Sequence, residues 1–358
     1  MIVLGDLHLG IKNFDRQIYL SMIDYLKGVI DYSAEKDDKV IFQLGDMFNN
    51  RTTTNILFLE EVKELFNYLK QKEVVLHSLL GNHDIYYRER KDISLVKHFN
   101  NLYPENFKIY EDKEDFIYHN KVIYVVPWLV KEEGLSKTEL KGKDIVFGHL
   151  EIAGFEVTKG HYDEKSQLSK SFFEKLKLPV LSGHYHIRNT EGIVKYLGTP
   201  YQLNWSDFNE IKGFYILDPD LNLSFIKNTL SPIHIKLIYN EDYSSPLEIK
   251  GTDKEIRISL DQLENYIDLL KNSYIKFIIN KSSNSKHEEF IFELQKHDIS
   301  FAILNNQELN NSIEYNPNVT IKPSKEVILD YIKEHRPELV KLAIDLFSEV
   351  DTQKNIKD

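Results

Sequence analysis

Five short blocks of the sequence place polar side chains with metal-ligating potential beside a glycine at the end of an apolar run. The residues concerned are Asp6 and His8 in GDLH, Asp46 in GDMF, Asn82, His83 and Asp84 in GNHD, His149 in GH, and His184 and His186 in GHYH. Residues i and i+2 of a strand point the same way, so the Asp6–His8 and His184–His186 pairs are each expected to converge. The neighbouring glycines let loops approach closely without a Cβ between them. We therefore predict that the five blocks build one site.

The donor atoms of these blocks suit two metal ions. Apart from His83 and Asp84, the blocks offer two carboxylates, one amide oxygen and four imidazoles. One carboxylate must then bridge, and two ions roughly 3.5–4 Å apart stabilise an in-line displacement at phosphorus. The chain has no Cys, and nitrogen and oxygen ligation without sulfur favours manganese, iron or zinc. The expected nucleophile is a metal-held hydroxide that attacks a phosphate ester.

His83 stands next to Asn82 but outside the predicted ligand set. We expect it to stabilise charge on the substrate or to protonate the leaving oxygen, with Asp84 fixing its tautomer. Any single block is weak evidence for a metal site, because an isolated histidine more often lies at the surface or in the core than binds a metal. Five blocks in this order, each at a strand end, favour the metal site instead. Among the other histidines, His161 alone stays a candidate substrate contact, because it follows a Lys-Gly pair.

Apolar runs and helical periodicity predict the elements that carry the blocks. Strands are predicted at 2–6, 39–46, 73–84, 121–128, 144–149 and 178–186, helices at 15–31 and 54–72, and antiparallel strands at 193–198, 213–218 and 222–227. After Pro232 a smaller α/β unit is predicted, with strands at 233–239, 255–260, 274–280 and 299–304 and helices at 262–271 and 286–297. An Asn-rich linker at 305–323 and two C-terminal helices within 324–350 complete the expected layout.

Length and composition limit the classes of protein that fit. At 358 residues the chain is too long for one ordinary core, and 42% hydrophobic residues exclude a largely disordered protein. A net charge of -11 argues against a wholly basic nucleic-acid-binding surface, although it is compatible with a local basic groove. No signal peptide or membrane-spanning run is recognisable, so a soluble cytoplasmic protein is expected.

The order D-x-H, G-D, G-N-H-D, G-H, G-H-x-H resembles that of the calcineurin-like metallophosphoesterases over about the first 230 residues. Within that superfamily, GDLHLG, GDMFNNR, GNHD and GTPYQLNWSDFNEIKGFYILD resemble the SbcD-type nuclease subunit of DNA double-strand-break repair complexes, above all the versions that bacteriophages use for recombination. The resemblance implies an α/β (α+β) fold, with a β-sandwich flanked by helices, a small α/β capping domain and C-terminal helices. It places one metal on Asp6, His8, Asp46 and His186, and the other on Asp46, Asn82, His149 and His184.

The same resemblance implies an activity, a domain layout and partners. Such proteins are 3′-to-5′ exonucleases on duplex DNA and endonucleases on single strands, mostly with manganese, and magnesium is the alternative ion. They are homodimers that form a heterotetramer with an SbcC-like, SMC-type ATPase, here in a bacterial or phage-infected cell. The implied parts are a nuclease domain at 1–230, a DNA-capping domain at 231–304, the linker at 305–323 and ATPase-docking helices at 324–358. Many relatives have His where this chain has Asn49, which leaves the balance between the two nuclease activities open.

Candidate DNA contacts follow the third block. They combine aromatic and basic residues, as single-strand-binding surfaces do, with a solvated loop as the alternative: Tyr86, Tyr87, Arg88, Arg90 and Lys91. Arg51 is a candidate phosphate contact whose alternative is a salt bridge, and the 205–212 loop is expected to shape the site. Two other functions fit the same blocks. One is a different calcineurin-like phosphodiesterase or phosphatase, and the other is a non-catalytic DNA-end scaffold for the ATPase. The complete ligand set argues against the scaffold.

Overall fold

The structure, a computed structural model, describes residues 1–305 except 88, 131–132, 159–160, 165, 167 and 282–285, together with 340–341. The chain divides into two units, Met1–Asn305 and Asn306–Asp358, and every element below belongs to the first. Apart from 305 and 340–341, the predicted linker and C-terminal helices lie outside the described residues. The predicted domain boundaries therefore stay predictions.

The first sheet has a parallel centre built from short apolar strands. Its order is β18-β17-β1-β2-β3-β6, in which β17 pairs antiparallel with β1 and the strands from β1 to β6 run parallel. Parallel strands are buried on both faces and so read as continuous apolar runs, as this chain shows. The bounds are β1 (Ile2–Leu4), β2 (Val40–Gln43), β3 (Val75–Leu79), β6 (Phe107–Tyr110), β17 (Gly213–Leu217) and β18 (Leu223–Lys227).

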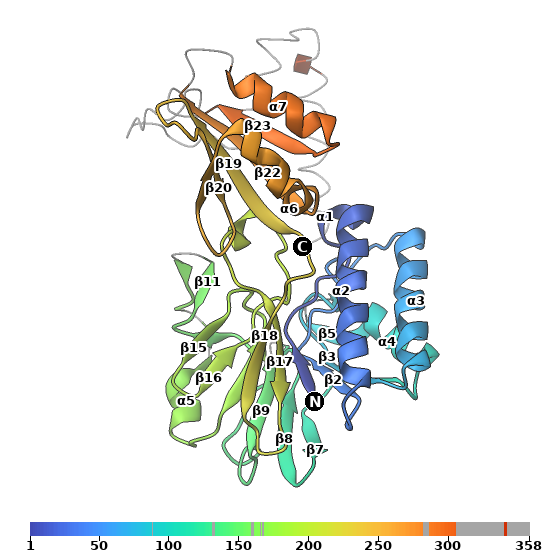
Figure 1. Ribbon diagram of the computed structural model, residues 1–358. Coiled ribbons are helices and arrows are strands. Elements are labelled where there is room, and N and C mark those ends of the chain that lie inside the picture. The colour runs from blue at the N-terminus through green and yellow to red at the C-terminus, as the bar shows by residue number, and fades with distance from the viewer. Residues whose placement is uncertain are drawn as a thin grey trace. The chain divides into compact units, whose positions relative to one another are not determined.

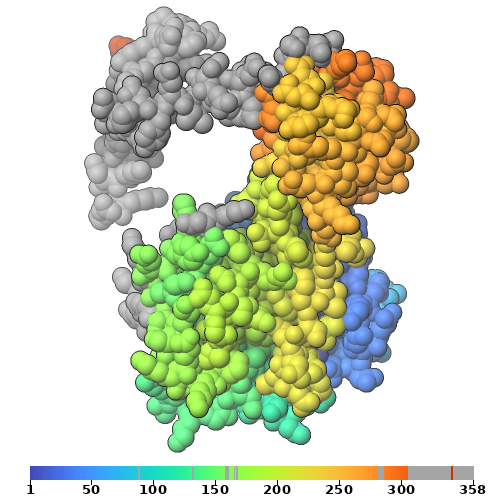
Figure 2. Space-filling view, turned by 60° about the vertical axis from the view of Figure 1, so that its left-hand side comes forward, coloured from blue at the N-terminus to red at the C-terminus, as the bar shows by residue number. Residues whose placement is uncertain are grey.

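A second six-stranded sheet packs face to face on the first. Its order is β15-β16-β14-β9-β8-β7, and the bounds are β7 (Glu114–Tyr118), β8 (Lys121–Val126), β9 (Ile145–His149), β14 (Val180–Gly183), β15 (Asn189–Glu191) and β16 (Val194–Tyr196). Val3 and Phe42 of the first sheet share a buried cluster with Val125 and Phe147 of the second. Figure 2 shows the outer side of the second sheet with α5 (Lys170–Glu174), in green, beside the β17–β18 hairpin, in yellow.

Helices cover the outer face of the first sheet (Figure 1). The helix α2 (Arg16–Ala34) begins where the Asp15 side chain accepts a hydrogen bond from the Ile18 amide. The helix α3 (Ile56–Gln71) begins at Asn55, whose side chain caps the amides of Leu57 and Phe58, and α4 (Leu95–Leu102) follows later. The expected β-sandwich with flanking helices is thus confirmed. No helix in the described part of the chain is long and apolar enough to span a membrane.

A third sheet forms beyond Pro232, as the change in sequence pattern predicted. Its order is β21-β20-β19-β22-β23, and one buried cluster joins it to its own helices. The predicted helix at 262–271 is in fact a 3₁₀ helix, η2, that continues into α6, and the strand β20 was missed. The bounds are β19 (Ile233–Asn240), β20 (Leu247–Lys250), β21 (Ile256–Ile258), η2 (Leu260–Tyr266), α6 (Ile267–Lys271), β22 (Ser273–Lys281), α7 (Lys286–Lys296) and β23 (Phe301–Asn305).

Candidate metal centre

Four of the polar blocks lie at or in the loops that follow β1, β2, β3 and β14, and the fifth, with His149, is the end of β9. The parallel strands end at one edge of the sandwich, so their loops meet there. The expected reason for the convergence was wrong, because β1 ends at Leu4 and β14 at Gly183, before the polar pairs begin. The backbone instead turns through left-handed conformations, with φ of 45° at His8, 56° at Asp46 and 87° at His184. Such strain in non-glycine residues is characteristic of functional sites.

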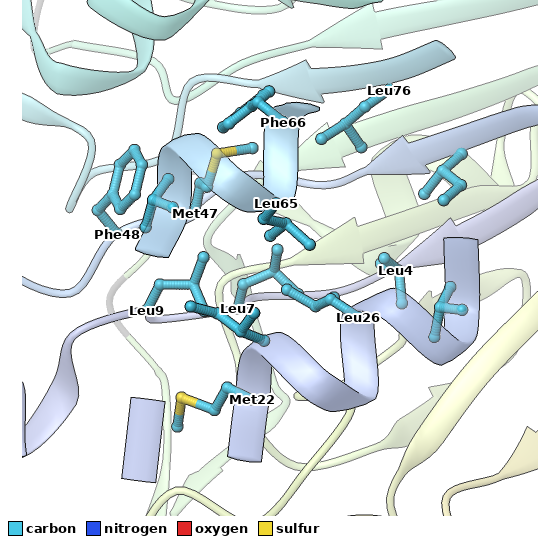
Figure 3. Packing of buried hydrophobic residues seen from close by; sticks show 14 of the residues in the cluster. Leu4, Leu7, Leu9, Met22, Leu26, Met47, Phe48, Leu65, Phe66 and Leu76 are labelled. Atoms are coloured by element: carbon cyan, nitrogen blue, oxygen red, sulfur yellow. The ribbon is translucent and has the colours of Figure 1, made fainter. Parts of the chain in front are cut away.

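Apolar residues between the polar ones anchor these loops. Leu7 and Leu9 alternate with His8, Met47 and Phe48 follow Asp46, and all four side chains are buried against α2 and α3 (Figure 3). The amides of Leu7 and His8 both donate to the Asp46 carbonyl, at 3.0 and 2.9 Å, so the first two loops are tied together. The loops are thereby held rigidly by the hydrophobic core, which gives the polar side chains fixed positions.

Two of the glycines allow contacts that a side chain would block. A Cβ on Gly81 would overlap the carboxylate of Asp46, and a Cβ on Gly183 would overlap that of Asp6. The amide of His184, directly after Gly183, donates to both oxygens of Asp6 at 3.0 Å. The glycines beside the polar residues are therefore needed for close approach of the loops, as predicted.

One group of candidate ligands consists of Asp6, His8 and His186, whose ligand atoms all lie within 4.8 Å of one another. The Nε2 atoms of His8 and His186 are 2.8 Å apart, and Asp6 Oδ2 lies 4.0 and 3.8 Å from them. The Nδ1 atom of His8 is buried and has no hydrogen-bond partner among the described residues. Two imidazole nitrogens therefore face each other beside a carboxylate, and one cation could bind all three groups.

The second group consists of Asp46, His149 and His184, again within 4.8 Å, with Asn82 beside them. His149 Nδ1 lies 2.7 Å from the Leu44 carbonyl and donates to it, so in the neutral ring, the form that binds a metal, the lone pair is on Nε2. Asn82 Oδ1 lies 3.0 Å from this Nε2 and 3.1 Å from His184 Nδ1. One amide oxygen and two imidazole nitrogens therefore face one point.

Asp46 connects the two groups. Its Oδ2 atom lies 3.6 Å from His8 Nε2 and 3.5 Å from His149 Nε2, and its Oδ1 atom accepts the His83 amide at 2.7 Å. A carboxylate between two ligand groups is what a bridging ligand requires.

Burial and mutual charge perturb the carboxylates of the site. Burial, with Asp46 nearby, raises the pKa of Asp6 to about 8, and the same two causes raise the pKa of Asp84 to about 7. Burial alone would also raise the pKa of Asp46, but His149 and then His8 outweigh it and hold that pKa below its ordinary value. Three buried carboxyl groups this close favour added positive charge. The donor set and its burial therefore fit a pair of divalent ions.

His83 lies at the site, but Asp84 does not orient it. The His83 ring is 4.9 Å from that of His8, and its Nδ1 atom lies 2.8 Å from the Asn49 carbonyl. The Asp84 carboxylate is instead occupied by the amides of Phe48, at 3.1 Å, and Gly81, at 2.9 Å. The expectation that Asp84 fixes the His83 tautomer is therefore wrong. An aspartate directly after the histidine turns inward and closes the loop, and the backbone of Asn49 takes the expected role.

The candidate DNA contacts lie on a hairpin of β4 (Ile85–Tyr87) and β5 (Arg90–Ser94). Tyr86 and Tyr87 are exposed, and the Arg90 guanidinium lies 4.0 Å from the centre of the Tyr87 ring. Lys91 is different, because its ammonium group pairs with Glu133 at 2.7 Å and donates to the Glu111 carbonyl. Arg88 lies outside the described residues. Arg51 is partly exposed after the second block, and His161 is exposed in β12 (His161–Tyr162).

Other residues at the site were not found from the sequence. Glu151 Oε1 lies 3.2 Å from His184 Nε2, on the wall of a cavity of about 1050 Å³ that reaches His149 and His184. Lys212 donates to the His186 carbonyl at 2.9 Å and pairs with buried Asp207 at 2.8 Å. An acid two positions after His149 was a visible signal for Glu151. The Lys212 contact matches the expectation that the 205–212 loop shapes the site.

A protein-family comparison agrees with this geometry. The family model described as calcineurin-like phosphoesterase matches residues 1–188, which contain all five polar blocks. The chain belongs to the calcineurin-like phosphoesterase family. This phosphoesterase is therefore a metal-dependent hydrolase of phosphate esters, and the two ligand groups fit the two metal ions that the family binds.

Individual proteins that are similar to this phosphoesterase include a phage protein and a solved structure. Exonuclease subunit 1 of Enterobacteria phage T4 is 27% identical over 337 residues, which are 92% of this chain and 96% of that protein. A crystal structure of a protein of unknown function from Aquifex aeolicus covers 54% of this chain and 82% of its own, with 16% identity and a TM-score of 0.28.

Proposed function

We propose that this phosphoesterase is a DNA nuclease, acting as a 3′-to-5′ exonuclease on duplex DNA and an endonuclease on single strands. The observation that carries the proposal is the similarity to the phage exonuclease subunit over 92% of the chain, because it extends far past residue 188, where the family match ends. The similarity thus includes the third sheet, which hydrolysis of a small phosphate ester does not require.

In this proposal the metal ions share Asp46. Asp6, His8 and His186 complete one site, and Asn82, His149 and His184 complete the other, as the two groups around Asp46 support. Two bound divalent ions would supply a nucleophile at neutral pH and neutralise charge on the phosphate. The mixture of imidazole and carboxylate donors favours Mn²⁺, with Mg²⁺ as the alternative.

His83 acts on the substrate in this scheme. Its Nδ1 atom is held by the Asn49 carbonyl at 2.8 Å, which makes Nδ1 the protonated nitrogen of the neutral ring. The neutral ring then has no hydrogen on Nε2, so it is the protonated ring, with a second hydrogen on Nε2, that can stabilise the phosphate or transfer a proton to the leaving oxygen. The centre of the His83 ring lies 4.9 Å from that of His8, which places it beside the candidate ligands. Asp84 supports the loop through two backbone amides and is not assigned a direct chemical role.

DNA would be held by the β4–β5 hairpin and the third sheet. Exposed Tyr86 and Tyr87 offer faces on which unpaired bases can stack, and Arg90 and Arg51 offer charge for phosphates. Lys91 is the weaker candidate, because breaking its pair with Glu133 would offset the gain from a phosphate contact.

The proposed setting is a homodimer in complex with an SMC-type ATPase that acts in DNA double-strand-break repair or recombination. The relative's printed name, a subunit, supports a multi-protein assembly. We expect the predicted helices at 324–358 to contact the ATPase. Co-purification of the full-length chain and of a 1–305 chain with a co-encoded ATPase would test this contact.

The decisive experiment compares substrates. Purified protein with Mn²⁺ or Mg²⁺ is given end-labelled duplex, single-stranded and hairpin DNA, and separately a chromogenic phosphate monoester. We expect manganese-dependent release of nucleotides from duplex ends, and its loss in Asp46→Asn but not in His98→Ala, which changes an exposed histidine of α4. Faster hydrolysis of the monoester than of DNA would favour the phosphatase alternative. A folded protein that binds no metal would favour the scaffold.

A further inference from the structure

The two nitrogens of His184 face different partners on opposite flanks of the ring. Nδ1 lies 3.1 Å from Asn82 Oδ1, on the side of the candidate ligand group, and Nε2 lies 3.2 Å from Glu151 Oε1. A neutral imidazole carries one hydrogen, so the nitrogen that binds a metal must be the other one. Which nitrogen is free at His184 is therefore decided by the group that accepts its N–H.

His149 shows the same arrangement with the nitrogens exchanged. Its Nδ1 atom faces the Leu44 carbonyl at 2.7 Å, so Nε2 is the one left for Asn82 and Asp46. At His149 the acceptor is a buried backbone group that no substitution removes. At His184 the corresponding acceptor is a side chain, and the orientation of the ring depends on it.

Glu151 is held in place by its neighbours. The buried Leu150 amide donates to Ser182 Oγ at 3.0 Å, and the buried Ile152 amide donates to Tyr196 Oη at 3.1 Å. The chain on both sides of Glu151 is thus fixed to the second sheet, while the Glu151 side chain is 48% exposed at the cavity wall. The carboxylate is presented to His184 from a rigid backbone.

We propose that Glu151 is a positioning residue of the metal centre. Its carboxylate accepts the hydrogen of His184 Nε2, which keeps the Nδ1 lone pair directed toward Asn82 and Asp46. A direct ligand role for Glu151 does not fit, because its oxygen lies on the flank of the ring away from Asn82. Trp128 assists from a third direction, since its ring packs on that of His184 with centres 5.2 Å apart.

This inference rests on the proposed two-metal site and predicts a specific change in metal affinity. Acceptors that orient metal-binding histidines typically alter metal affinity by about 10–100-fold when they are removed. We expect Glu151→Ala to weaken one of two Mn²⁺ sites by about that factor and to leave the other unchanged. Glu151→Gln should lose less, because the amide oxygen still accepts the Nε2 hydrogen although the negative charge is gone.

The test is calorimetric titration of chelator-treated, full-length protein with Mn²⁺, in the wild type, Glu151→Ala and Glu151→Gln. Glu174→Gln, which removes one charge from an exposed position on α5, is the matched control and should bind like the wild type. Thermal melting of each metal-free variant checks that the fold is retained, as expected for a half-exposed side chain.

The outcomes separate this inference from the proposed function. Two wild-type sites with equal affinities in Glu151→Ala would overturn the role of Glu151 and leave the metal centre standing. Equal losses in Glu151→Gln and Glu151→Ala would also overturn it, because charge alone would then explain the effect. No Mn²⁺ binding by the wild type would contradict the proposed function itself. Weakening of one site in Glu151→Ala with partial recovery in Glu151→Gln would support the proposal.

Discussion

His8 and His186 direct their Nε2 atoms at each other across 2.8 Å, although 178 positions separate them in the sequence. A single hydrogen could join the two rings, but the nearby carboxylate of Asp6 would gain nothing from it. A divalent ion between the rings would satisfy both nitrogens and the carboxylate together. The histidine pair therefore leads to a prediction about metal and stability.

Manganese should stabilise the metal-free protein, and His186→Ala should lose part of that gain. An ion that binds only the folded chain stabilises it by about 2.7 kcal/mol at a concentration one hundred times its Kd. Removing one imidazole raises the Kd at that site and so shrinks the gain. Differential scanning calorimetry with and without Mn²⁺ measures this stabilisation as an increase in Tm. The control variant His98→Ala should keep the full increase. An undiminished increase in His186→Ala would argue against a ligand role.

Replacing His83 should slow the reaction without releasing metal. If His83 stabilises or protonates the substrate, His83→Ala should lower kcat by about 10²–10⁴-fold, the usual contribution of such a group. Mn²⁺ stoichiometry, measured by elemental analysis, should stay at the wild-type value because the proposed ligand set is intact. Loss of metal in this variant would instead make His83 a ligand, which its place within 4.8 Å of His8 and Asp46 allows.

Much of the fold followed from local patterns because the signals were strong. Strands ending at the polar blocks and the helices at 15–31 and 54–72 were predicted within a few residues, since buried parallel strands and amphipathic helices leave clear periodicities. The β20 strand, with only four residues, and the change from η2 to α6 left no comparable signal. Short elements depend on their neighbours in space, which sequence periodicity does not record.

At the site, residue types were predictable and contacts were not. The blocks named the residues that converge, but the left-handed turns at His8 and Asp46, rather than strand geometry, bring them together. The sequence suggests that Asp84 contacts His83 because the two are adjacent, whereas its oxygens accept the amide of Gly81 in its own loop and the amide of Phe48 in the loop after β2. Glu151 contacts a residue 33 positions away, and a single sequence does not reveal such pairs.

Tyr87 should contribute to binding of single-stranded DNA. Stacking of one base on an aromatic side chain is worth about 1–3 kcal/mol, so Tyr87→Ala should weaken binding of a labelled oligonucleotide by that amount. The matched control is Tyr32→Ala, because Tyr32 lies on α2, outside the proposed DNA contacts, and Lys36 lies 4.3 Å from the centre of its ring, as Arg90 lies 4.0 Å from that of Tyr87. Fluorescence anisotropy at one fixed salt concentration measures both. Equal effects of the two substitutions would refute a special role for the hairpin.

The buried Asp207–Lys212 pair should be costly to break. Both side chains are 4% exposed, and Lys212 also holds the His186 carbonyl. Lys212→Met leaves a buried carboxylate without its partner, which typically destabilises a protein by about 3–5 kcal/mol, and it frees the loop that carries His186. Urea unfolding measures the loss. Lys63→Met, which breaks an exposed pair with Glu60, should cost less than about 1 kcal/mol, and similar losses in both variants would contradict the argument.

His77 should make the stability of the protein fall as the pH is lowered. Burial, and then the charge of Lys108, lowers the pKa of His77 to about 4, and its ring stacks on Phe42 with centres 5.7 Å apart. Between pH 6.5, the ordinary pKa of histidine, and pH 4 the unfolded chain binds a proton that the folded chain does not. The contribution of His77 is therefore complete above pH 6.5 and is lost as the pH falls toward 4, by about 3 kcal/mol over that window.

In His77→Gln the loss of stability that His77 contributes between pH 6.5 and pH 4 should disappear, because glutamine does not titrate. The variant should also be less stable than the wild type at pH 7, because it lacks the stacked ring. Urea unfolding of metal-free protein at pH 7, 6, 5 and 4.5 gives the slope for each chain, and the carboxylates of the metal centre contribute equally to both. His98→Gln removes an exposed histidine and should follow the wild type. A His77→Gln slope as steep as that of the wild type would mean that His77 is protonated in the folded protein despite its burial.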